Sequence, residues 1–247
     1  MNNIDNNICL IIPCYNEAKR LKKEVFLQFC KQNKACHLLF INDGSSDNTI
    51  EVLHELKEKN DKIQIIDLKK NIGKAEAVRQ GYLFALKKEY EYIGFFDADL
   101  STPLEESLRM KKHLSDSSLL YVFGSRIAKI GSNIERKSYR HYLGRIIATM
   151  IDFHLKLKVY DTQCGAKLMK RELAELIFNE KFISKWLFDV EILSRIIHKY
   201  GRETTKSMCL ELPLNEWKEI DGSKITLKDM FKIPFQLIKI SLKYSVL

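Results

Sequence analysis

The stretch ICLIIPCYNE, residues 8–17, decides the fold. Its apolar run from Ile8 to Ile12 is too short for a helix and Pro13 ends it, which is typical of a buried parallel strand that leads into a loop. Three further apolar runs have the same form and are also followed by polar residues: 38–41, 63–68 and 92–96. The segments between these runs carry apolar residues at helical spacing. Because strands and helices then alternate, the sequence predicts an α/β protein with an open, mostly parallel sheet and helices on both faces.

The helices are predicted from the apolar spacing between these strands. We expect the first to begin near Glu17, directly after the first loop. The second and third should turn these residues inward: Ile50, Leu53, Leu56, Ala77, Tyr82, Leu83 and Leu86. Further along, 119–126 predicts another strand and 136–161 a long amphipathic helix. Since no linker divides the chain, we expect one Rossmann-like domain over 1–225, with a mostly parallel mixed central sheet, and an amphipathic helical tail over 226–247 that belongs to it or contacts a membrane.

The composition bounds the partners and the compartment. With a net charge of +9, electrostatics should select anionic partners such as sugar nucleotides, phosphorylated lipids or an anionic membrane surface. We expect no nucleic-acid partner, because the basic residues are not interleaved with aromatic ones. Six cysteines without CxxC pairs, and no recognisable signal peptide, predict reduced core thiols in a cytoplasmic protein. The sequence contains no run of about 18 uncharged apolar residues, so we expect no membrane-spanning helix. The tail, which interleaves Lys232, Lys239 and Lys243 with apolar residues, predicts peripheral contact instead.

Polar clusters follow each of the four predicted strands: PCYNE, NDGSSD, KKNIGK and DADLST. In open α/β sheets, ligands bind beyond the carboxyl ends of the strands. The four clusters should therefore lie along one edge and form a ligand site.

Asp97 and Asp99 flank a single alanine at the end of the fourth strand. In extended backbone, residues two apart project to the same side, so both carboxylates can face one divalent cation, Mg²⁺ or Mn²⁺, or a metal-bound diphosphate. A solvated acidic turn is the alternative interpretation, and the position at a strand exit favours the metal.

Three other strand exits carry candidate donor-binding residues. Asp43 can form an Asx turn or accept hydrogen bonds from a uracil or a ribose, and Glu17 can accept from a base or sugar. The GK of NIGKAEA lacks the spacing of a P-loop, yet Lys74 can still reach a phosphate.

The arginines suggest a second anion site. Arg136 and Arg140 are four residues apart and share a helix face, while Arg126 follows a strand, so their convergence would bind a phosphate. A solvated basic helix is the alternative. In KWLFDVEIL, Trp186, Phe188 and Ile192 are expected in the core, and Asp189 and Glu191 either face the cleft or begin a helix.

Taken together and in this order, the motifs PCYNE, NDGSSDNT, NIGKAEAVRQG, DADLSTPLEE, GSR, DTQCGAK, KWLFDVEIL and NEWKEIDGSKI resemble those of inverting GT-A glycosyltransferases of family 2. Within that family the chain is most similar to polyprenyl-phosphate hexosyltransferases, first the dolichyl-phosphate β-glucosyltransferases and then the mannosyltransferases. The resemblance extends from about Ile8 to Ile225 and implies the GT-A fold.

The resemblance also implies roles for single residues. The donor-binding set would be Pro13, Tyr15, Asn16, Glu17, Asp43, Gly73, Lys74, Asp97 and Ala98. Asp97 and Asp99 would bind the metal, and Arg126, Arg136 and Arg140 would surround the phosphates of donor or acceptor. Gln163, Cys164, Gly165 and Lys167 would form a turn on the acceptor side. In one departure from the family, Asn42 replaces the first of two aspartates, so the base contact would depend on Asp43 alone.

The implied reaction moves a hexose, with glucose preferred, from a UDP- or GDP-sugar to a polyprenyl phosphate. The leaving diphosphate gains charge that a cation and basic residues must stabilise, and the acceptor phosphate is already anionic, so no strong base is required. Asp189 is therefore a possible catalytic residue of the cleft rather than a necessary one. Two alternatives stay open: a family 2 transferase that acts on a saccharide hydroxyl, and a non-catalytic nucleotide-sugar-binding protein. A homo-oligomer is also compatible with the sequence.

Overall fold

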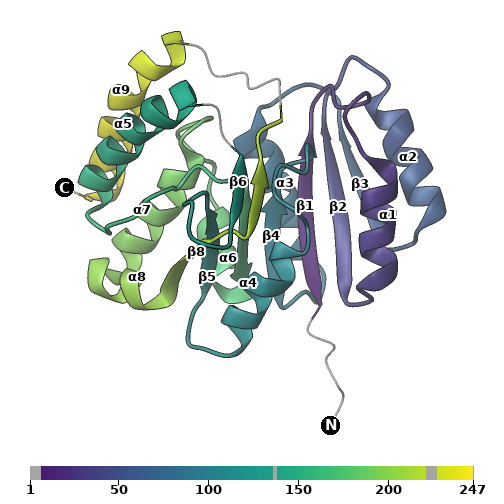
Figure 1. Cartoon of the computed structure of the whole chain (residues 1–247), viewed down its shortest axis with the longest axis horizontal. Coiled ribbons are helices and arrows are strands. Elements are labelled where there is room, and N and C mark those ends of the chain that lie inside the picture. Colours follow the sequence, from purple (N-terminus) through teal and green to yellow (C-terminus); the bar gives the residue numbers. More distant parts are fainter. Residues whose placement is uncertain (1–6, 136–137, 221–226, 247) are drawn as a thin grey trace.

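The computed structural model describes residues 7–135, 138–220 and 227–246, and leaves out the side chains of 138–144 and 227–231. Its main sheet has seven strands in the order β3-β2-β1-β4-β7-β5-β8 (Figure 1). The strands are β1 (Ile8–Cys14), β2 (Cys36–Asp43), β3 (Ile63–Leu68), β4 (Tyr92–Phe96), β5 (Tyr121–Ser125), β7 (Ala166–Lys170) and β8 (Cys209–Pro213). A small parallel sheet pairs β6 (Asn133–Glu135) with β9 (Glu216–Lys218).

The sheet is mixed because β7 runs against its neighbours. It pairs antiparallel with both β4 and β5, whereas β1, β2, β3 and β4 are parallel to one another and β5 is parallel to β8. The predicted mostly parallel mixed sheet is therefore confirmed.

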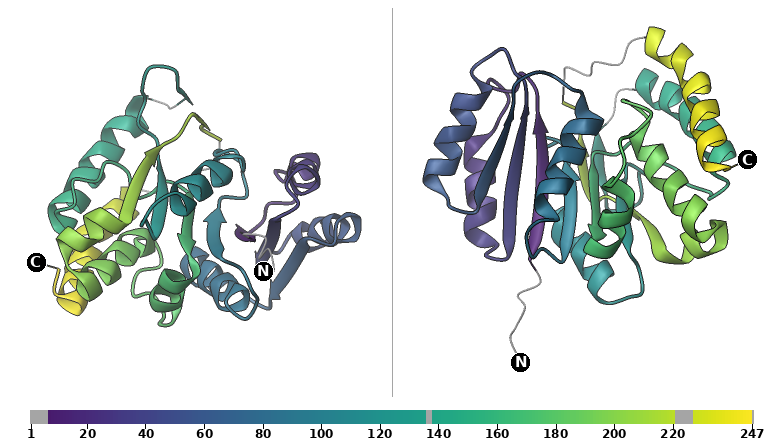
Figure 2. Two further views of the ribbon diagram at one scale, coloured as in Figure 1. Left: turned by 90° about the horizontal axis from the view of Figure 1, so that it is seen from below. Right: turned by 180° about the vertical axis from the view of Figure 1, so that it is seen from behind.

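Helices cover both faces of this sheet (Figures 1 and 2). They are α1 (Lys23–Gln32), α2 (Thr49–Lys59), α3 (Lys74–Ala85), α4 (Glu106–Ser115), α5 (Ser138–Leu155), α6 (Arg171–Phe178), α7 (Phe188–Tyr200), α8 (Arg202–Met208) and α9 (Leu227–Tyr244). Alternate residues of β1 face opposite cores: Cys9 and Ile11 meet α3, α6 and α7, while Leu10 and Ile12 meet α1, α2 and α4. Burial on both faces explains why the sequence of β1 is almost continuously apolar.

The first helix begins at Lys23, so the prediction of a start near Glu17 is wrong. Two backbone N–H groups of the preceding loop donate to side chains at the β2–α2 connection instead of within a helix: Glu17 N donates to Thr49 Oγ1 at 2.8 Å, and Ala18 N to Asp47 Oδ2 at 3.2 Å. Ile50, Leu83 and Leu86 are only partly buried, and of these three only Leu86 packs against a core cluster, so the expectation that Ile50 and Leu83 turn inward is also corrected.

The C-terminal helix α9 packs on the rest of the protein beside α5, as Figures 1 and 2 show. One side of α9 enters the core through Ile233, Leu237, Ile240 and Tyr244. Large apolar side chains remain exposed on the other side of α9 and on α5: Ile146 (58%), Phe153 (80%), Phe235 (70%), Ile238 (55%) and Leu242 (73%). We call these five residues the apolar face.

No helix among the described residues combines the length and the hydropathy that a membrane crossing requires. All six cysteines are free thiols, five of them buried and Cys209 partly so, which confirms the prediction of core thiols.

Candidate active site

A cavity of about 800 Å³ opens where the parallel strands end. Residues at the carboxyl ends of β1 and β2 and in the segments after β1, β3 and β4 line it: Pro13, Tyr15, Glu17, Asp43, Gly73, Lys74, Asp97, Ala98 and Asp99. The structure thus brings the four strand exits together at one edge of the sheet. Asn16, which the sequence also suggested, lies outside this lining, and its Oδ1 accepts a hydrogen bond from Ser46 N at 2.8 Å.

Asp43 and Glu17 each hold a neighbouring part of the site. The Asp43 carboxylate accepts hydrogen bonds from Ile72 N at 2.7 Å and Gly73 N at 3.0 Å. It therefore fixes the β3–α3 turn, in which Gly73 adopts a left-handed φ of 91°. The Glu17 carboxylate accepts from Arg20 Nε at 2.8 Å, and this arginine also lines the cavity. Arg20 is a site residue that the sequence analysis missed.

Asp97 and Asp99 both line the cavity, but not from extended backbone as predicted. Leu100 N donates to Asp97 O at 3.3 Å, so residues 97–100 form a turn. Asp97 Oδ1 lies 2.5 Å from Lys74 Nζ, and Asp99 Oδ1 accepts from Ser101 N and Oγ at 2.9 and 2.7 Å. Both aspartates therefore lie at the predicted site, but the expectation that extended backbone points them to the same side is wrong.

The space for Asp97 depends on Gly165, in the turn before β7. A Cβ atom at this position would lie 1.9 Å from Asp97 Oδ2, and Asp97 N donates to Gly165 O at 3.0 Å. No larger residue fits without displacing the carboxylate.

The donor set of this turn suits a hard cation that is shared with a substrate. Among the described residues no group of three or more His, Cys, Asp or Glu side chains could hold a metal. Asp97 and Asp99 provide two carboxylates, and Mg²⁺ in particular is usually held by one or two carboxylates together with substrate phosphates rather than in an all-protein cage. The residues therefore fit a cation that arrives with a diphosphate.

Basic residues also line the cavity. Arg126 makes a two-point ion pair with Asp161, at 2.6 Å from Nε and 2.8 Å from Nη2, and its guanidinium lies 5.3 Å from the Trp217 ring. Burial alone would lower the pKa of Arg126, but Asp161 more than offsets this and raises it. Arg145, which the sequence analysis missed, stacks on Tyr160 at 3.8 Å and also lines the cavity.

The two other predicted arginines cannot be placed at this site. Arg136 lies outside the described residues, and Arg140 belongs to α5 but its side chain is not among those described. The prediction that three arginines converge therefore stays a prediction for these two.

Asp189 faces the cavity from the first turn of α7 and forms an ion pair with Lys167 at 2.9 Å. Both side chains are almost fully buried, with exposed fractions of 7% and 1%. Burial raises the pKa of Asp189, and Lys167 and Lys74 offset part of the rise. Glu191, two residues on, is also buried but lies outside the cavity lining.

One wall of the cavity is apolar. Ile147, Ala148 and Ile151 contribute from α5, and Trp186 and Phe188 from the start of α7. Phe188 and Ile192 lie in the core as predicted, whereas Trp186 is only partly buried. Lys185 lines the cavity as well, with its Cδ 3.9 Å from where a Cβ of Gly73 would lie. Basic side chains, carboxylates and an apolar wall thus border one cavity.

A protein-family model described as "Glycosyl transferase family 2" matches residues 9–178. The chain belongs to glycosyl transferase family 2. The family and the GT-A fold predicted from the motifs are thereby confirmed, and the protein is a glycosyltransferase.

Other members of glycosyl transferase family 2 resemble it over most of its length. It is 33% identical to a dolichyl-phosphate beta-glucosyltransferase of Dictyostelium discoideum over 96% of this chain and 74% of that relative. It is 32% identical to the enzyme of the same name from Homo sapiens over 88% of this chain and 69% of the relative. Among solved structures, glucosyl-3-phosphoglycerate synthase from Mycobacterium tuberculosis, in complex with Mn²⁺, UDP and glucosyl-3-phosphoglycerate, superposes with a TM-score of 0.69 at 15% identity, covering 97% of this chain and 80% of that one.

The site residues of this family 2 protein that sequence analysis missed are Arg20, Arg145 and Lys185. Arg20 and Lys185 stand in quoted motifs or next to them, but neither belongs to a strand exit. Arg145 ends the arginine-rich stretch RKSYRHYLGR, and its position over the Tyr160 ring is evident only in the folded structure. Periodicity alone gives no signal for such contacts between distant segments.

Proposed function

We propose that the protein transfers a hexose, glucose from UDP-glucose in the first instance, to the phosphate of a polyprenyl lipid. One observation carries this proposal: a single cavity has a carboxylate side at the strand ends and an apolar wall on α5, the helix whose outer side belongs to the apolar face. A nucleotide sugar suits the first side and an isoprenoid the second. The names of the relatives, dolichyl-phosphate beta-glucosyltransferases, support the same substrates.

On the donor side, Tyr15, Glu17 and Asp43 would contact the nucleoside. Asp97 and Asp99 would hold Mg²⁺ or Mn²⁺ on the diphosphate, where the cation stabilises the negative charge of the leaving group. Lys74 at the start of α3 lies next to Asp97 and can reach the same diphosphate. This assignment agrees with the Mn²⁺ and UDP in the superposable synthase structure.

On the acceptor side, Arg126 and Arg145, which line the cavity, would bind the lipid phosphate, and Arg136 and Arg140 are further candidates. A phosphate oxygen that attacks the anomeric carbon from the side opposite the leaving diphosphate inverts its configuration. The acceptor is an anion near neutral pH, so the reaction needs no general base. Asp189 suits this mechanism because Lys167 already neutralises it, and we assign the pair to shaping the sugar site.

The apolar face supports a proposed membrane contact. Its five side chains lie on neighbouring helices, and Lys239 and Lys243 of α9 are interspersed among them. Apolar residues beside lysines are suited to an anionic membrane surface. We propose peripheral binding of this face to the cytoplasmic leaflet, with the cavity open toward the lipid phosphate.

The experiment that tests the function is a substrate panel. UDP- and GDP-hexoses are incubated with short-chain polyprenyl phosphates and Mg²⁺ or Mn²⁺, and the lipid is analysed by mass spectrometry. We expect a hexosyl-phosphate lipid, made most rapidly from UDP-glucose. If no donor and acceptor pair gives a glycosylated lipid, the proposal is wrong.

The same panel, extended to saccharide acceptors, distinguishes the proposed function from two alternatives: a transferase that acts on a saccharide hydroxyl and a non-catalytic nucleotide-sugar-binding protein. An enzyme that acts on a hydroxyl needs a base, so Asp189→Asn would abolish turnover while changes at Arg126 and Arg145 would matter less. A nucleotide-sugar sensor would bind UDP-glucose and transfer it to nothing.

A further inference from the structure

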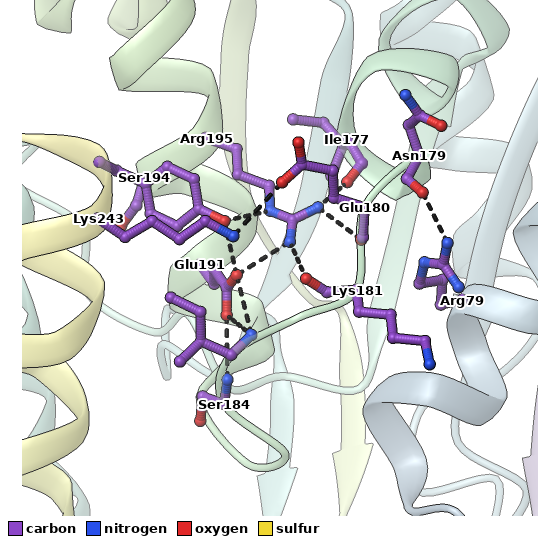
Figure 3. Close-up of polar contacts among 12 residues, drawn as sticks. Arg79, Ile177, Asn179, Glu180, Lys181, Ser184, Glu191, Ser194, Arg195 and Lys243 are labelled. Atoms are coloured by element: carbon purple, nitrogen blue, oxygen red, sulfur yellow. Dashed lines mark hydrogen bonds and ion pairs between the residues drawn. The ribbon is translucent and has the colours of Figure 1, made fainter.

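A buried polar cluster on the far side of α7 from the cavity has no part in the chemistry described above. Glu191 and Arg195 lie one helical turn apart, their side chains 0% and 6% exposed, and form an ion pair at 3.0 Å. Figure 3 shows both side chains pointing toward the backbone of the α6–α7 connection. Burying two charges is costly unless their hydrogen-bonding capacity is filled, so what they contact is informative.

The two side chains hold the backbone of the segment 179–187, which we call the α6–α7 loop. Arg195 donates to the carbonyl oxygens of Glu180 and Lys181 at 2.9 and 2.7 Å. The Glu191 carboxylate accepts from Ile183 N at 2.9 Å and Ser184 N at 3.2 Å. At the start of the loop, Asn179 O accepts from Arg79 of α3 at 2.6 Å (Figure 3). Side chains of α7 and α3 therefore position this irregular segment.

The loop ends at the cavity. Its next residues, Lys185 and Trp186, both line the cavity, and Lys185 reaches the β3–α3 turn at Gly73. Gly73 directly precedes Lys74, so a lysine at this place would serve the diphosphate side of the proposed donor site together with Lys74. Its position therefore bears on the stage of the reaction at which charge develops on the leaving group.

The C-terminal helix α9 completes the cluster from outside. Tyr244 Oη donates to Glu191 Oε1 at 2.8 Å and accepts from Arg195 Nε at 3.0 Å. Eight residues earlier in α9, Gln236 Oε1 accepts a hydrogen bond from Ser184 Oγ at 2.5 Å. Ser184 Oγ in turn accepts from Leu187 N at 2.7 Å and so helps to begin α7. Two residues of α9 thus contact the groups that fix the loop.

We propose that Tyr244 and Gln236 are positioning residues: through Glu191, Arg195 and Ser184, α9 holds the α6–α7 loop so that Lys185 faces the donor diphosphate. This inference rests on the proposed function for the meaning of the lysine, but not for the contacts. It makes α9 part of the transferase site, and the same helix carries three residues of the apolar face.

The test uses two substitutions in the full chain that each remove one contact. Tyr244→Phe deletes only the hydroxyl, and Gln236→Leu deletes the acceptor for Ser184. Tyr200→Phe is the matched control, since it deletes the same atom from a tyrosine at the end of α7 that is 39% exposed. We expect kcat with UDP-glucose and a short polyprenyl phosphate to fall about tenfold in both variants, with the KM for the lipid nearly unchanged and the control at wild-type rate.

Combination with Lys185→Gln separates positioning from general damage. If α9 acts through this lysine, adding Tyr244→Phe to Lys185→Gln slows transfer little further. Multiplicative losses, or single variants within twofold of the wild type, would overturn the proposal.

A second readout does not depend on transfer. In a Trp217→Phe background Trp186 is the remaining tryptophan, and its quenching by acrylamide reports how firmly the loop is held. We expect Tyr244→Phe and Gln236→Leu to increase the quenching and Tyr200→Phe to leave it unchanged. Equal quenching in all of them would refute the positioning role even if the wild-type protein transferred no sugar, whereas increased quenching without transfer would contradict only the proposed function.

Discussion

Replacing Gly165 by alanine tests whether the placement of Asp97 matters for transfer. The new Cβ would lie 1.9 Å from Asp97 Oδ2, and ordinary contact begins near 3.4 Å, so the carboxylate must retreat by the difference, about 1.5 Å. The displacement changes the geometry of the Asp97 pair with Lys74, whose Nζ now lies 2.5 Å from Oδ1. Misplacement of a reacting group by about 1 Å can cost a factor of about 100, and we expect a loss of that size in kcat/KM.

The fold should tolerate the same change. Asp97 is 32% exposed and can rotate toward solvent, and φ of Gly165 is not in the left-handed region that favours glycine. We therefore expect the melting temperature to stay within a few degrees of the wild type while transfer collapses. Transfer is measured by mass analysis of the glucosylated lipid at several UDP-glucose concentrations, and melting by circular dichroism.

A double-mutant cycle shows whether the loss passes through Asp97. Asp97→Ala alone should be about as slow as Gly165→Ala combined with Asp97→Ala, because the carboxylate that the methyl group displaces is then absent. Our reasoning is refuted if Gly165→Ala retains transfer within a few-fold of the wild type, or if the two losses multiply.

Three further outcomes are expected. Asp99→Ala should lower Mn²⁺-dependent transfer at least about 100-fold with an unchanged melting curve, and an unfolded variant would instead assign Asp99 a structural role. Phe153→Ser combined with Phe235→Ser should reduce sedimentation with vesicles of phosphatidylcholine and phosphatidylserine several-fold, without slowing transfer to a detergent-dispersed short lipid; unaltered sedimentation contradicts the proposed membrane face. Burial lowers the pKa of His154, so its neutral form favours the folded state and its contribution is lost as pH falls below about 6.5. The melting temperature should therefore fall between pH 7 and pH 5, and His154→Asn, which retains a polar group near Ser241 Oγ, should make that fall smaller.

The sequence predicts the edge of the sheet well because parallel strands obey a local rule. Each apolar run ends at a polar cluster, and the carboxyl ends of parallel strands must lie together, so Glu17, Asp43, Lys74 and Asp97 could be placed in one site before the fold was known. The rule depends on burial and chain direction alone, and both leave a strong pattern in sequence.

What the sequence could not predict depends on contacts between distant segments. The late start of α1 follows from hydrogen bonds of its preceding loop to Asp47 and Thr49, about thirty residues away. The same holds for Glu191, which stands two residues after Asp189 in one helix and therefore points in a different direction, away from the cavity. Which of the two faces the site follows from where the sheet and α9 pack, and no local period encodes that.

Ion pairs explain how several carboxylates can remain close together in the cavity. Four of those that line it are each paired with a basic side chain: Glu17 with Arg20, Asp97 with Lys74, Asp161 with Arg126 and Asp189 with Lys167. The pairs of Asp161 and Asp189 are mostly buried, so breaking them would leave an uncompensated charge and they are suited to fixing geometry. The Lys74–Asp97 pair is 42% and 32% exposed, and water screens it, so it can open at little cost. We therefore expect Asp97 to exchange its lysine for a cation and Lys74 to turn to the diphosphate, which makes this pair the part of the site that changes when the donor binds.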